Sequence, residues 1–166
     1  MKKIIVLLLI TFAFFSCEKD DICAESTPTT PKLIIRFYDI SSQEDTKNVT
    51  GLKVTGFDEN NVEIDISNLN IVTTDSINLP LRTDADLTKF VIYKDYVNDV
   101  TIGNPDTVTI RYEREDVYVS RACGFKTIFK NLTFSFESDG DNWIVNDEII
   151  NSTLDNETKA HVKIFH

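Results

Sequence analysis

The sequence predicts an all-β protein with one β-sandwich domain. Segments in which apolar and polar residues alternate recur about every 8–12 residues, with turn-forming residues between them. Outside the N-terminal apolar run, no segment carries a sustained helical repeat of apolar residues. We expect an immunoglobulin-like sandwich, and a small β-barrel or a transthyretin-like sandwich is the alternative.

The first half of the domain contains alternating or largely apolar segments separated by turns. Gly51 and Gly56 predict bulges or turn edges, and Pro80 places its strand at the edge of a sheet because proline lacks a backbone N–H. The predicted strands are residues 33–40, 49–57, 62–66, 77–82 and 90–93, with a turn at 58–61.

The stretch from Thr107 to Phe136 is expected to form the centre of the core. Apolar residues alternate at 108, 110 and 112, the charged residues 114–116 interrupt the alternation, and it resumes at 117–119. We therefore expect a hairpin that turns at residues 114–116, followed by a third strand at 132–137.

The last third predicts further turns and strands. Turns are expected at residues 103–106, 139–142 and 155–157, and strands at 143–145 and 160–165. Trp143 is expected in the core. His161 and His166 lie five residues apart on the last strand and so point to opposite faces, which excludes a shared metal ion. We expect both at the surface.

Charge excludes one class of partner. The chain has 166 residues, 17 of them basic and 27 acidic. Two of the basic residues lie in residues 1–16, so the remaining 150 residues carry a net charge of −12. A surface this acidic disfavours nucleic acid, which is bound through basic residues that displace counterions. The remaining length is that of one ordinary domain.

Residues 1–16 predict a signal peptide. Lys2 and Lys3 precede an apolar run of 12 residues, whereas a membrane span needs about 20. The run ends at Ser16 and Cys17, which resembles a lipobox, although Phe14 and Phe15 replace its usual leucine and small residue. We expect acylation of Cys17, palmitate included. The alternative is an ordinary secretory signal cut elsewhere, which leaves Cys17 unpaired.

Residues 17–32 are expected to form the lipidated N-terminus and a short tether to the β-sandwich domain, residues 33–166. Residues 18–21 read Glu-Lys-Asp-Asp, which resembles the surface-export signal of Bacteroidetes-type lipoproteins. A merely solvated acidic tether is the alternative. The resemblance implies an outer-membrane protein exposed at the cell surface.

Cysteine counting predicts one disulfide. If Cys17 takes lipid, Cys23 and Cys123 remain, and the exported compartment is oxidising. Two buried free thiols are the alternative. Since Cys23 follows Cys17 by six residues, the bridge would hold the fold within about 20 Å of the lipid, at about 3.5 Å per extended residue.

The sequence offers no catalytic, cofactor-binding or metal-binding set. It has no Gly-x-Ser-x-Gly motif and no phosphate-binding glycine loop, and residues 139–150 do not fit a calcium loop. Ser76 and Thr107 follow aspartate and precede an apolar residue, a pattern that resembles Bacteroidetes-type O-glycosylation sites.

Several segments together resemble a family of Bacteroidetes-type lipoproteins, a domain of unknown function. They are Cys17 with its acidic tail, Cys23, KLIIRFYD at 32–39, NLPL at 78–81, VSRACGFKTIF at 119–129 and AHVKIF at 160–165. The resemblance implies location and fold, and it brings no activity, cofactor or catalytic residue with it.

Two functions are expected from these features. The first is a non-catalytic, lipid-anchored outer-membrane module, either an accessory subunit of a membrane-protein complex or a peptide- or glycan-binding protein. The alternative is a carboxylate-dependent surface hydrolase, on the abundance of acidic residues alone. In both cases the lipid anchor makes the membrane a partner.

Overall fold

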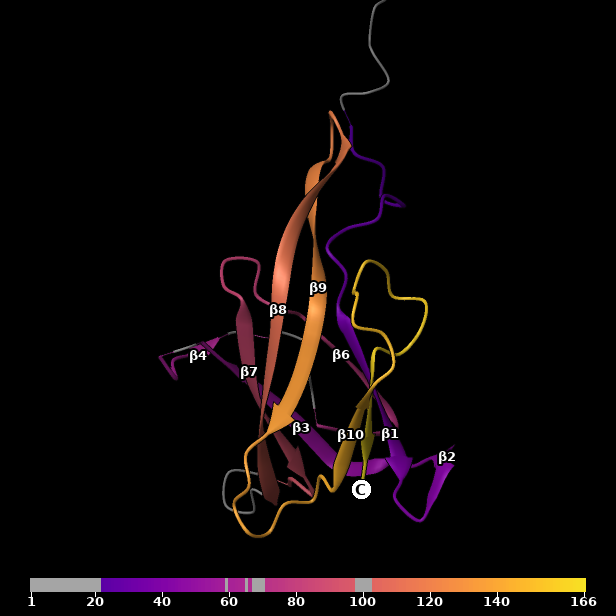
Figure 1. The fold of residues 1–166 in the computed structure, drawn as a ribbon, viewed down its shortest axis with the longest axis vertical. Helices are drawn as coiled ribbons and strands as arrows, with labels where there is room; N and C mark the ends of the chain where they lie inside the picture. Colours follow the sequence, from indigo (N-terminus) through magenta and orange to yellow (C-terminus); the bar gives the residue numbers. More distant parts are fainter. Residues whose placement is uncertain (1–21, 59, 65, 67–70, 98–102) are drawn as a thin grey trace, which may run out of the picture.

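The fold is a sandwich of two β-sheets, seen in a computed structural model that describes residues 22–58, 60–64, 66, 71–97 and 103–166 (Figure 1). The β-sandwich prediction is confirmed, and the barrel alternative is wrong because the sheets do not close on each other. Within the described residues, no helix is long and apolar enough to cross a membrane.

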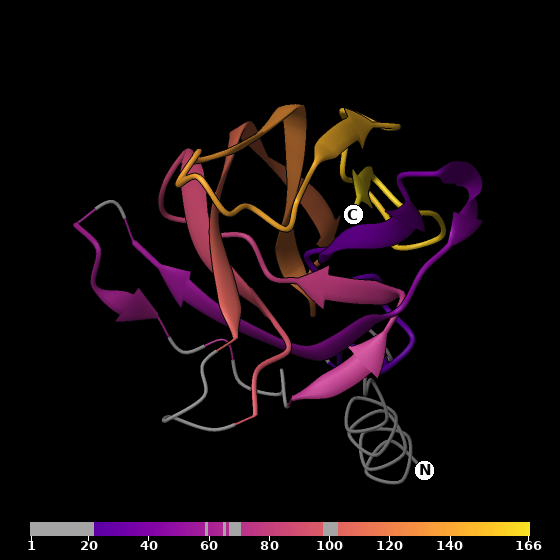
Figure 2. The same cartoon turned by 90° about the horizontal axis from the view of Figure 1, so that it is seen from below.

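The first sheet is built around β1, Leu33–Asp39. Its other strands are β2 (Ser42–Thr46), β6 (Ser76–Leu79), β10 (Asn146–Ile149) and β11 (Val162–Phe165). β11 runs parallel to β1 on one side, while β6 and β2 pair antiparallel with successive parts of its other side. Seen from below, the yellow C-terminal strands lie beside the indigo β1 (Figure 2). β6 ends before Pro80 and is shorter than the predicted strand at 77–82. Within the described part of the chain it pairs with β1 alone, so its predicted place at a sheet edge is confirmed.

The second sheet is an antiparallel array in which β3, β7, β8 and β9 follow one another. Its strands are β3 (Val49–Phe57), β4 (Glu63–Ile64), β5 (Val72–Thr74), β7 (Leu87–Lys94), β8 (Asn104–Ser120) and β9 (Gly124–Phe136). The predicted bulge at Gly51 is confirmed. Its φ is +53°, and a Cβ there would lie 2.6 Å from the Tyr96 carbonyl oxygen, so only glycine fits.

The predicted turn at residues 114–116 is wrong, because β8 continues through them as one strand of 17 residues. The outer half of β8 pairs only with β9, and its residues 113–116 are all exposed, so charged side chains are accepted there. The opposite residues of β9, 127–129, are buried. Glu115 forms an ion pair with Lys130, and Asp116 accepts a hydrogen bond from the Thr127 hydroxyl at 2.8 Å. The hairpin turns at residues 121–123 instead. The predicted turn at 103–106 is also mostly strand, since β8 begins at Asn104.

Residues 143–145 do not form the predicted strand, because the chain crosses there from β9 in one sheet to β10 in the other. Side chains hold the crossing in place of a strand ladder. The Ile144 N–H donates to the Asp106 carboxylate at 2.8 Å, and Trp143 Nε1 donates to the Ile92 carbonyl at 3.1 Å. Trp143 is 6% exposed, so its prediction as a core residue is confirmed.

The prediction that both histidines lie at the surface is wrong. His161 and His166 are 2% and 6% exposed. His161 Nδ1 accepts a hydrogen bond from the Ile34 N–H at 3.3 Å. The His166 ring packs edge-on against Trp143, with ring centroids 5.6 Å apart. Because β11 pairs with the central strand β1, its side chains are covered although it lies near the end of the chain.

These buried histidines predict a loss of stability in weak acid. Burial lowers the pKa of both imidazoles below the usual 6.5. As the pH falls, the unfolded chain therefore takes up protons before the folded one. The contribution of the neutral histidines to the free energy of unfolding is expected to be complete above about pH 6.5. It is lost as the pH falls through their lower folded-state pKa values. Urea unfolding between about pH 7.5 and about pH 5 measures this loss.

A matched variant isolates the histidine contribution. His161→Asn keeps an acceptor near the Ile34 N–H but does not titrate, so its stability should fall less over the same pH range. Burial raises the pKa of Asp106 and Asp147, which acts with the opposite sign at lower pH. Both acids are present in both proteins and cancel in the comparison. Equal pH slopes for the variant and the parent would contradict the assignment to His161.

Candidate functional site at the hairpin tip

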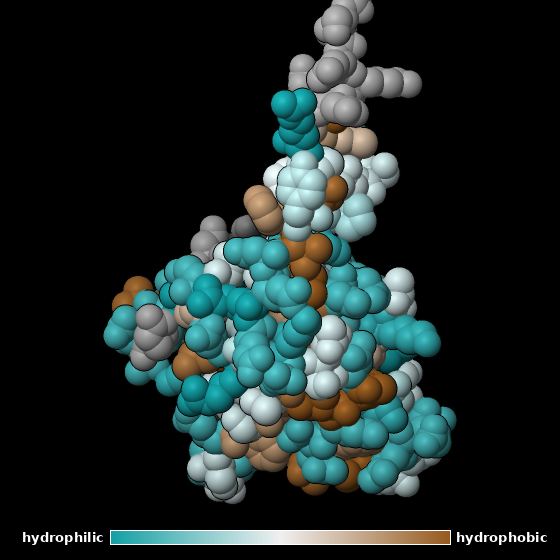
Figure 3. All heavy atoms as spheres, turned by 45° about the horizontal axis from the view of Figure 1, so that its top comes forward, coloured by the Kyte–Doolittle hydropathy of each residue, from teal (hydrophilic) through white to brown (hydrophobic). Residues whose placement is uncertain are grey.

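The outer part of the β8–β9 ribbon projects beyond the sandwich, and the indigo N-terminal segment runs beside it (Figure 1). We call residues 22–30 together with residues 117–126 the hairpin tip. In the space-filling view the tip is a narrow protrusion that carries apolar and hydrophilic residues side by side, above a body whose visible face is largely hydrophilic (Figure 3).

The predicted disulfide between Cys23 and Cys123 is confirmed. It joins the N-terminal segment to the turn of the ribbon, with the two Cα atoms 4.9 Å apart and a sequence separation of 100. Further bonds continue along the segment: Thr30 Oγ1 accepts from the Thr127 N–H at 3.0 Å, and the Lys32 N–H donates to Glu157 at 2.8 Å. The segment is therefore fixed at several points, to the ribbon at Cys23 and Thr30 and to the loop before β11 at Lys32.

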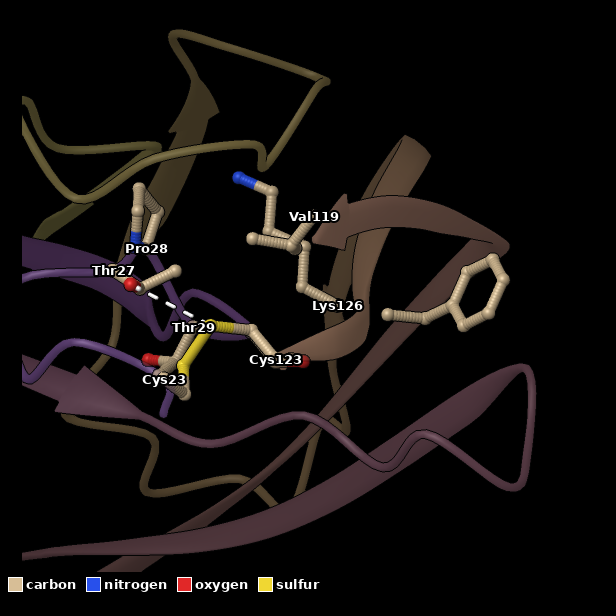
Figure 4. A pocket seen from close by; sticks show the side chains of 9 residues that line it. Cys23, Thr27, Pro28, Thr29, Val119, Cys123 and Lys126 are labelled. Carbon is tan, nitrogen blue, oxygen red and sulfur yellow. Dashed lines mark hydrogen bonds between the residues drawn. A yellow bond between two sulfur atoms is a disulfide. The ribbon is translucent and has the colours of Figure 1, made fainter. Parts of the chain in front are cut away.

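Two hollows flank the disulfide. One, of about 270 Å³, has Thr27 and Pro28 on one side and Val119 and Lys126 on the other, and the disulfide lies between them (Figure 4). Cys123 Sγ lies 3.6 Å from Thr27 Oγ1 in the same wall. The other hollow, of about 430 Å³, is lined by Ile22, Ala24, Thr27, Tyr118, Ser120, Arg121, Ala122 and Cys123. Apolar groups and hydroxyls line both hollows, and no carboxylate of the described residues does.

Large apolar side chains are exposed at the tip. Tyr118 and Phe125 are partners across the two strands, and their rings meet edge to face with centroids 5.4 Å apart. They are 59% and 67% exposed, and Ile22 is 84% exposed. Sequence alone left the exposure of Tyr118 open and did not single out Phe125. Alternation predicts which residues share a face, but it does not reveal that the face with Tyr118 and Phe125 is exposed.

A third hollow, of about 250 Å³, lies at the base of the ribbon and is polar. It is lined by Thr83, Asp86, Arg114 and Asp116. Arg114 donates to the Asp86 carboxylate and to the Thr83 carbonyl, both at 2.7 Å. Asp116 is bonded to the Thr127 hydroxyl. Both carboxylates are thus engaged by neighbours that hold the ribbon to the loop before β7.

The other predicted site residues do not gather at the tip. Ser76 lies in β6, half-buried, and its hydroxyl donates to the Ile35 carbonyl at 3.2 Å. Thr107 is half-buried in β8. O-glycosylation at these two residues stays a prediction, and Cys17 lies outside the described residues. Among the residues that the structure describes, no three His, Cys, Asp or Glu side chains are grouped so as to hold a metal ion.

The fold and the tip define an all-β sandwich with a projecting hairpin that is joined by a disulfide to its own N-terminal segment. The model of a family of unknown function (DUF6452) matches residues 51–166, from the middle of β3 through β11. The chain belongs to this family. The match includes Cys123 but not Cys23. No curated protein and no solved structure matches the chain.

Proposed function

We propose that this protein is a lipid-anchored module of the outer membrane, exposed at the cell surface, that acts without catalysis. It would serve as an accessory subunit of a membrane-protein complex or as a binder of a peptide or glycan. The short basic and apolar leader, the cysteine that follows it and the acidic residues 18–21 support the anchor and its location.

The Cys23–Cys123 bridge is the observation that carries the proposal. A disulfide is typical of an exported protein, and it uses two of the three cysteines, leaving Cys17 for lipid. It also fixes the chain six residues after the anchor to the end of the ribbon. The tether is then too short to hold the domain far from the membrane. A protein held so close is suited to working against other membrane components.

Acylation of Cys17 is the first part of the proposal to test. In the native host, Cys17→Ser is expected to release the protein from the membrane fraction and to remove the mass of the acyl chains, because two or more chains anchor stably. Intact-mass spectrometry and fractionation measure both. The double variant Cys23→Ala/Cys123→Ala is the control, since it keeps Cys17 and should stay on the membrane. A Cys17→Ser protein that remains acylated would contradict the proposed lipid anchor at Cys17.

The role at the membrane needs a separate experiment. The tagged, full-length protein is purified from its own membranes in mild detergent, and its companions are identified by mass spectrometry. A stoichiometric membrane-protein companion supports the accessory-subunit role. A solitary protein that binds on a glycan or peptide array supports the binding role. Turnover of hydrolase substrates that is lost in Asp86→Asn or Asp116→Asn would overturn the non-catalytic proposal in favour of the surface hydrolase.

A further inference from the structure

We propose that the hairpin tip inserts its exposed aromatic and aliphatic side chains into the headgroup region of the membrane that carries the lipid anchor. This rests on the proposed anchor at Cys17 and adds a second contact to it. The inserting residues are Tyr118 and Phe125 of the ribbon and Ile22 of the N-terminal segment. The proposed occupant of this surface is the bilayer itself.

The exposed rings are the first argument. Tyr118 and Phe125 leave 59% and 67% of their surface in water, and Ile22 leaves 84%. The pair stacks edge to face on one side of the ribbon, and Ile22 and Tyr118 line the same hollow. Exposed apolar groups that gather at one place mark a surface that is covered in use. Tyrosine, with an apolar ring and a polar hydroxyl, is enriched at the level of lipid headgroups.

The length of the tether is the second argument, and it favours the bilayer as the partner that covers the tip. Five residues, 18–22, separate Cys17 from Cys23, and the bridge fixes Cys23 to the turn of the ribbon. Fully extended, this stretch spans about 20 Å. The headgroup region on one side of a bilayer is about 5–8 Å thick, from the difference between the total and hydrocarbon thicknesses. The tip is therefore the part of the described fold that lies nearest the anchor and within its reach.

The charge of the chain is the third argument. A net charge of −12 after residue 16 repels anionic lipid, so electrostatic attraction of the whole domain does not hold it to the surface. The tip differs from the rest. Its charged residues are Glu25, Arg121 and Lys126, so two of the three are basic. An arginine at the turn, beside an inserted apolar group, keeps its charge at the headgroups while its stem lies along the acyl boundary. Lys126 Nζ instead donates to the Asp155 carbonyl at 3.2 Å.

The rigid attachment of the N-terminal segment fixes the orientation of the domain on the membrane. A lipid on a free tether would let the domain rotate in any direction. The segment is fixed to the ribbon by the disulfide and Thr30, and to the loop before β11 by Lys32. The anchor and the aromatic pair therefore form two nearby points of contact. The ribbon then stands on the membrane, and the far end of the sandwich faces outward.

Depth-dependent quenching of tryptophan fluorescence tests the inference. The full-length lipoprotein is reconstituted into phosphatidylcholine vesicles that contain phosphatidylcholine brominated at shallow or deep acyl positions. Phe125→Trp places a reporter at the tip, and Tyr118→Trp repeats it on the neighbouring strand. The matched control is Val145→Trp, at a residue that is 55% exposed and lies in the crossing between β9 and β10. The native Trp143 is buried in all variants and supplies a common background.

The expected result is a blue shift of the tip reporters on reconstitution and quenching by shallow bromines that is about twofold or more stronger than for the control, as for a ring at headgroup level. Equal or absent quenching at the tip would overturn the inference. A blue shift without bromine quenching would also overturn it, because the ring would then be covered by protein, a second copy included.

Different results would contradict the proposed anchor and the proposed membrane contact of the tip. If the host does not acylate Cys17, the proposed anchor is wrong, and intact mass reports that directly. The purified chain is then coupled through the Cys17 thiol to a maleimide lipid in the same vesicles, since the disulfide occupies the other two cysteines. Quenching at Phe125→Trp in this form still supports insertion of the tip, and its absence refutes it.

Discussion

Removal of the Cys23–Cys123 disulfide is expected to lower the free energy of unfolding by about 2–5 kcal/mol. The bridge spans 100 residues of sequence. Closing so long a loop restricts the unfolded chain strongly, and the chain-entropy model gives about 4–5 kcal/mol for a loop of that size. A single domain has a total stability of about 5–15 kcal/mol, so the loss is a large part of it.

The measurement is urea unfolding of the Cys23→Ala/Cys123→Ala variant beside the parent. Cys17→Ser is the matched control, because it also removes a cysteine but leaves the bridge intact, and its unfolding midpoint should be unchanged. Reductant should lower the stability of the parent and of Cys17→Ser, and should leave the double variant unaffected. An unfolding midpoint in the double variant equal to that of the parent would show that the bridge does not stabilise the domain.

The same variant separates two roles of the bridge. The bonds from Thr30 and Lys32 remain in the double variant, and β1 begins only at Leu33. The sandwich should therefore keep its fold while the segment before Thr30 loses its attachment. If the tip contacts the bilayer as proposed, the Phe125 reporter should be quenched less in this variant, although the lipid at Cys17 is still present.

Sequence patterns predicted the strands that have one covered face. The predicted strand at 49–57 coincides with β3, and the predicted strand at 33–40 coincides with β1 apart from its last residue. Alternation of apolar and polar residues reflects side-chain burial, so it predicts strands in which buried and exposed side chains alternate. Alternation failed at residues 114–116 because β8 is exposed at consecutive positions there, although the opposite residues of β9 are buried, and it accepts charges without turning. Whether such a ribbon turns or continues depends on its partner strand, which is distant in sequence.

The predictions for the two histidines and for residues 143–145 were wrong for a different reason. Position near the chain end is a poor guide to exposure when the last strand pairs with the central strand of a sheet, as β11 does with β1. Trp143 and Ile144 are apolar because the crossing passes over the core there, whereas Val145 is 55% exposed. Both facts depend on which sheet each strand enters, and local sequence does not carry that information.

The candidate site was accessible from the sequence only in part. Counting cysteines and identifying the compartment paired Cys23 with Cys123. The aromatic pair could not be found in the same way, because Tyr118 and Phe125 are brought together by the register of β8 against β9 and by the turn at residues 121–123. The predicted turn at 114–116 lies about seven residues before the observed one, and a hairpin that turned there would not pair the two rings.

Truncation of Trp143 is expected to have an effect of similar size, with a loss of about 3–5 kcal/mol for Trp143→Ala. The ring lies where the sheets meet. It packs against Phe37 of β1, with centroids 6.0 Å apart, and its Nε1 donates to the Ile92 carbonyl of β7 at 3.1 Å. His166 of the C-terminal segment packs edge-on against it. Removal of the ring leaves a cavity that three separate elements line.

Two further variants separate packing from hydrogen bonding at Trp143. Trp143→Phe keeps much of the ring but removes the bond to Ile92, so a smaller loss of about 1–2 kcal/mol is expected. Val145→Ala is the control, since Val145 is 55% exposed two residues along the same crossing, and its effect should stay within about 0.5 kcal/mol. Urea unfolding measures all three.

The order of these losses tests how the two sheets are joined. If the crossing at residues 143–145 fixes the sheets through Trp143, the alanine variant should lose far more stability than the phenylalanine variant, and the Val145 variant almost none. Equal losses for alanine and phenylalanine would assign the effect to the bond with Ile92 instead. A small loss in both would mean that the sheets are held by the remaining core residues, such as Phe37 and Phe90, and that the crossing only follows the surface they create.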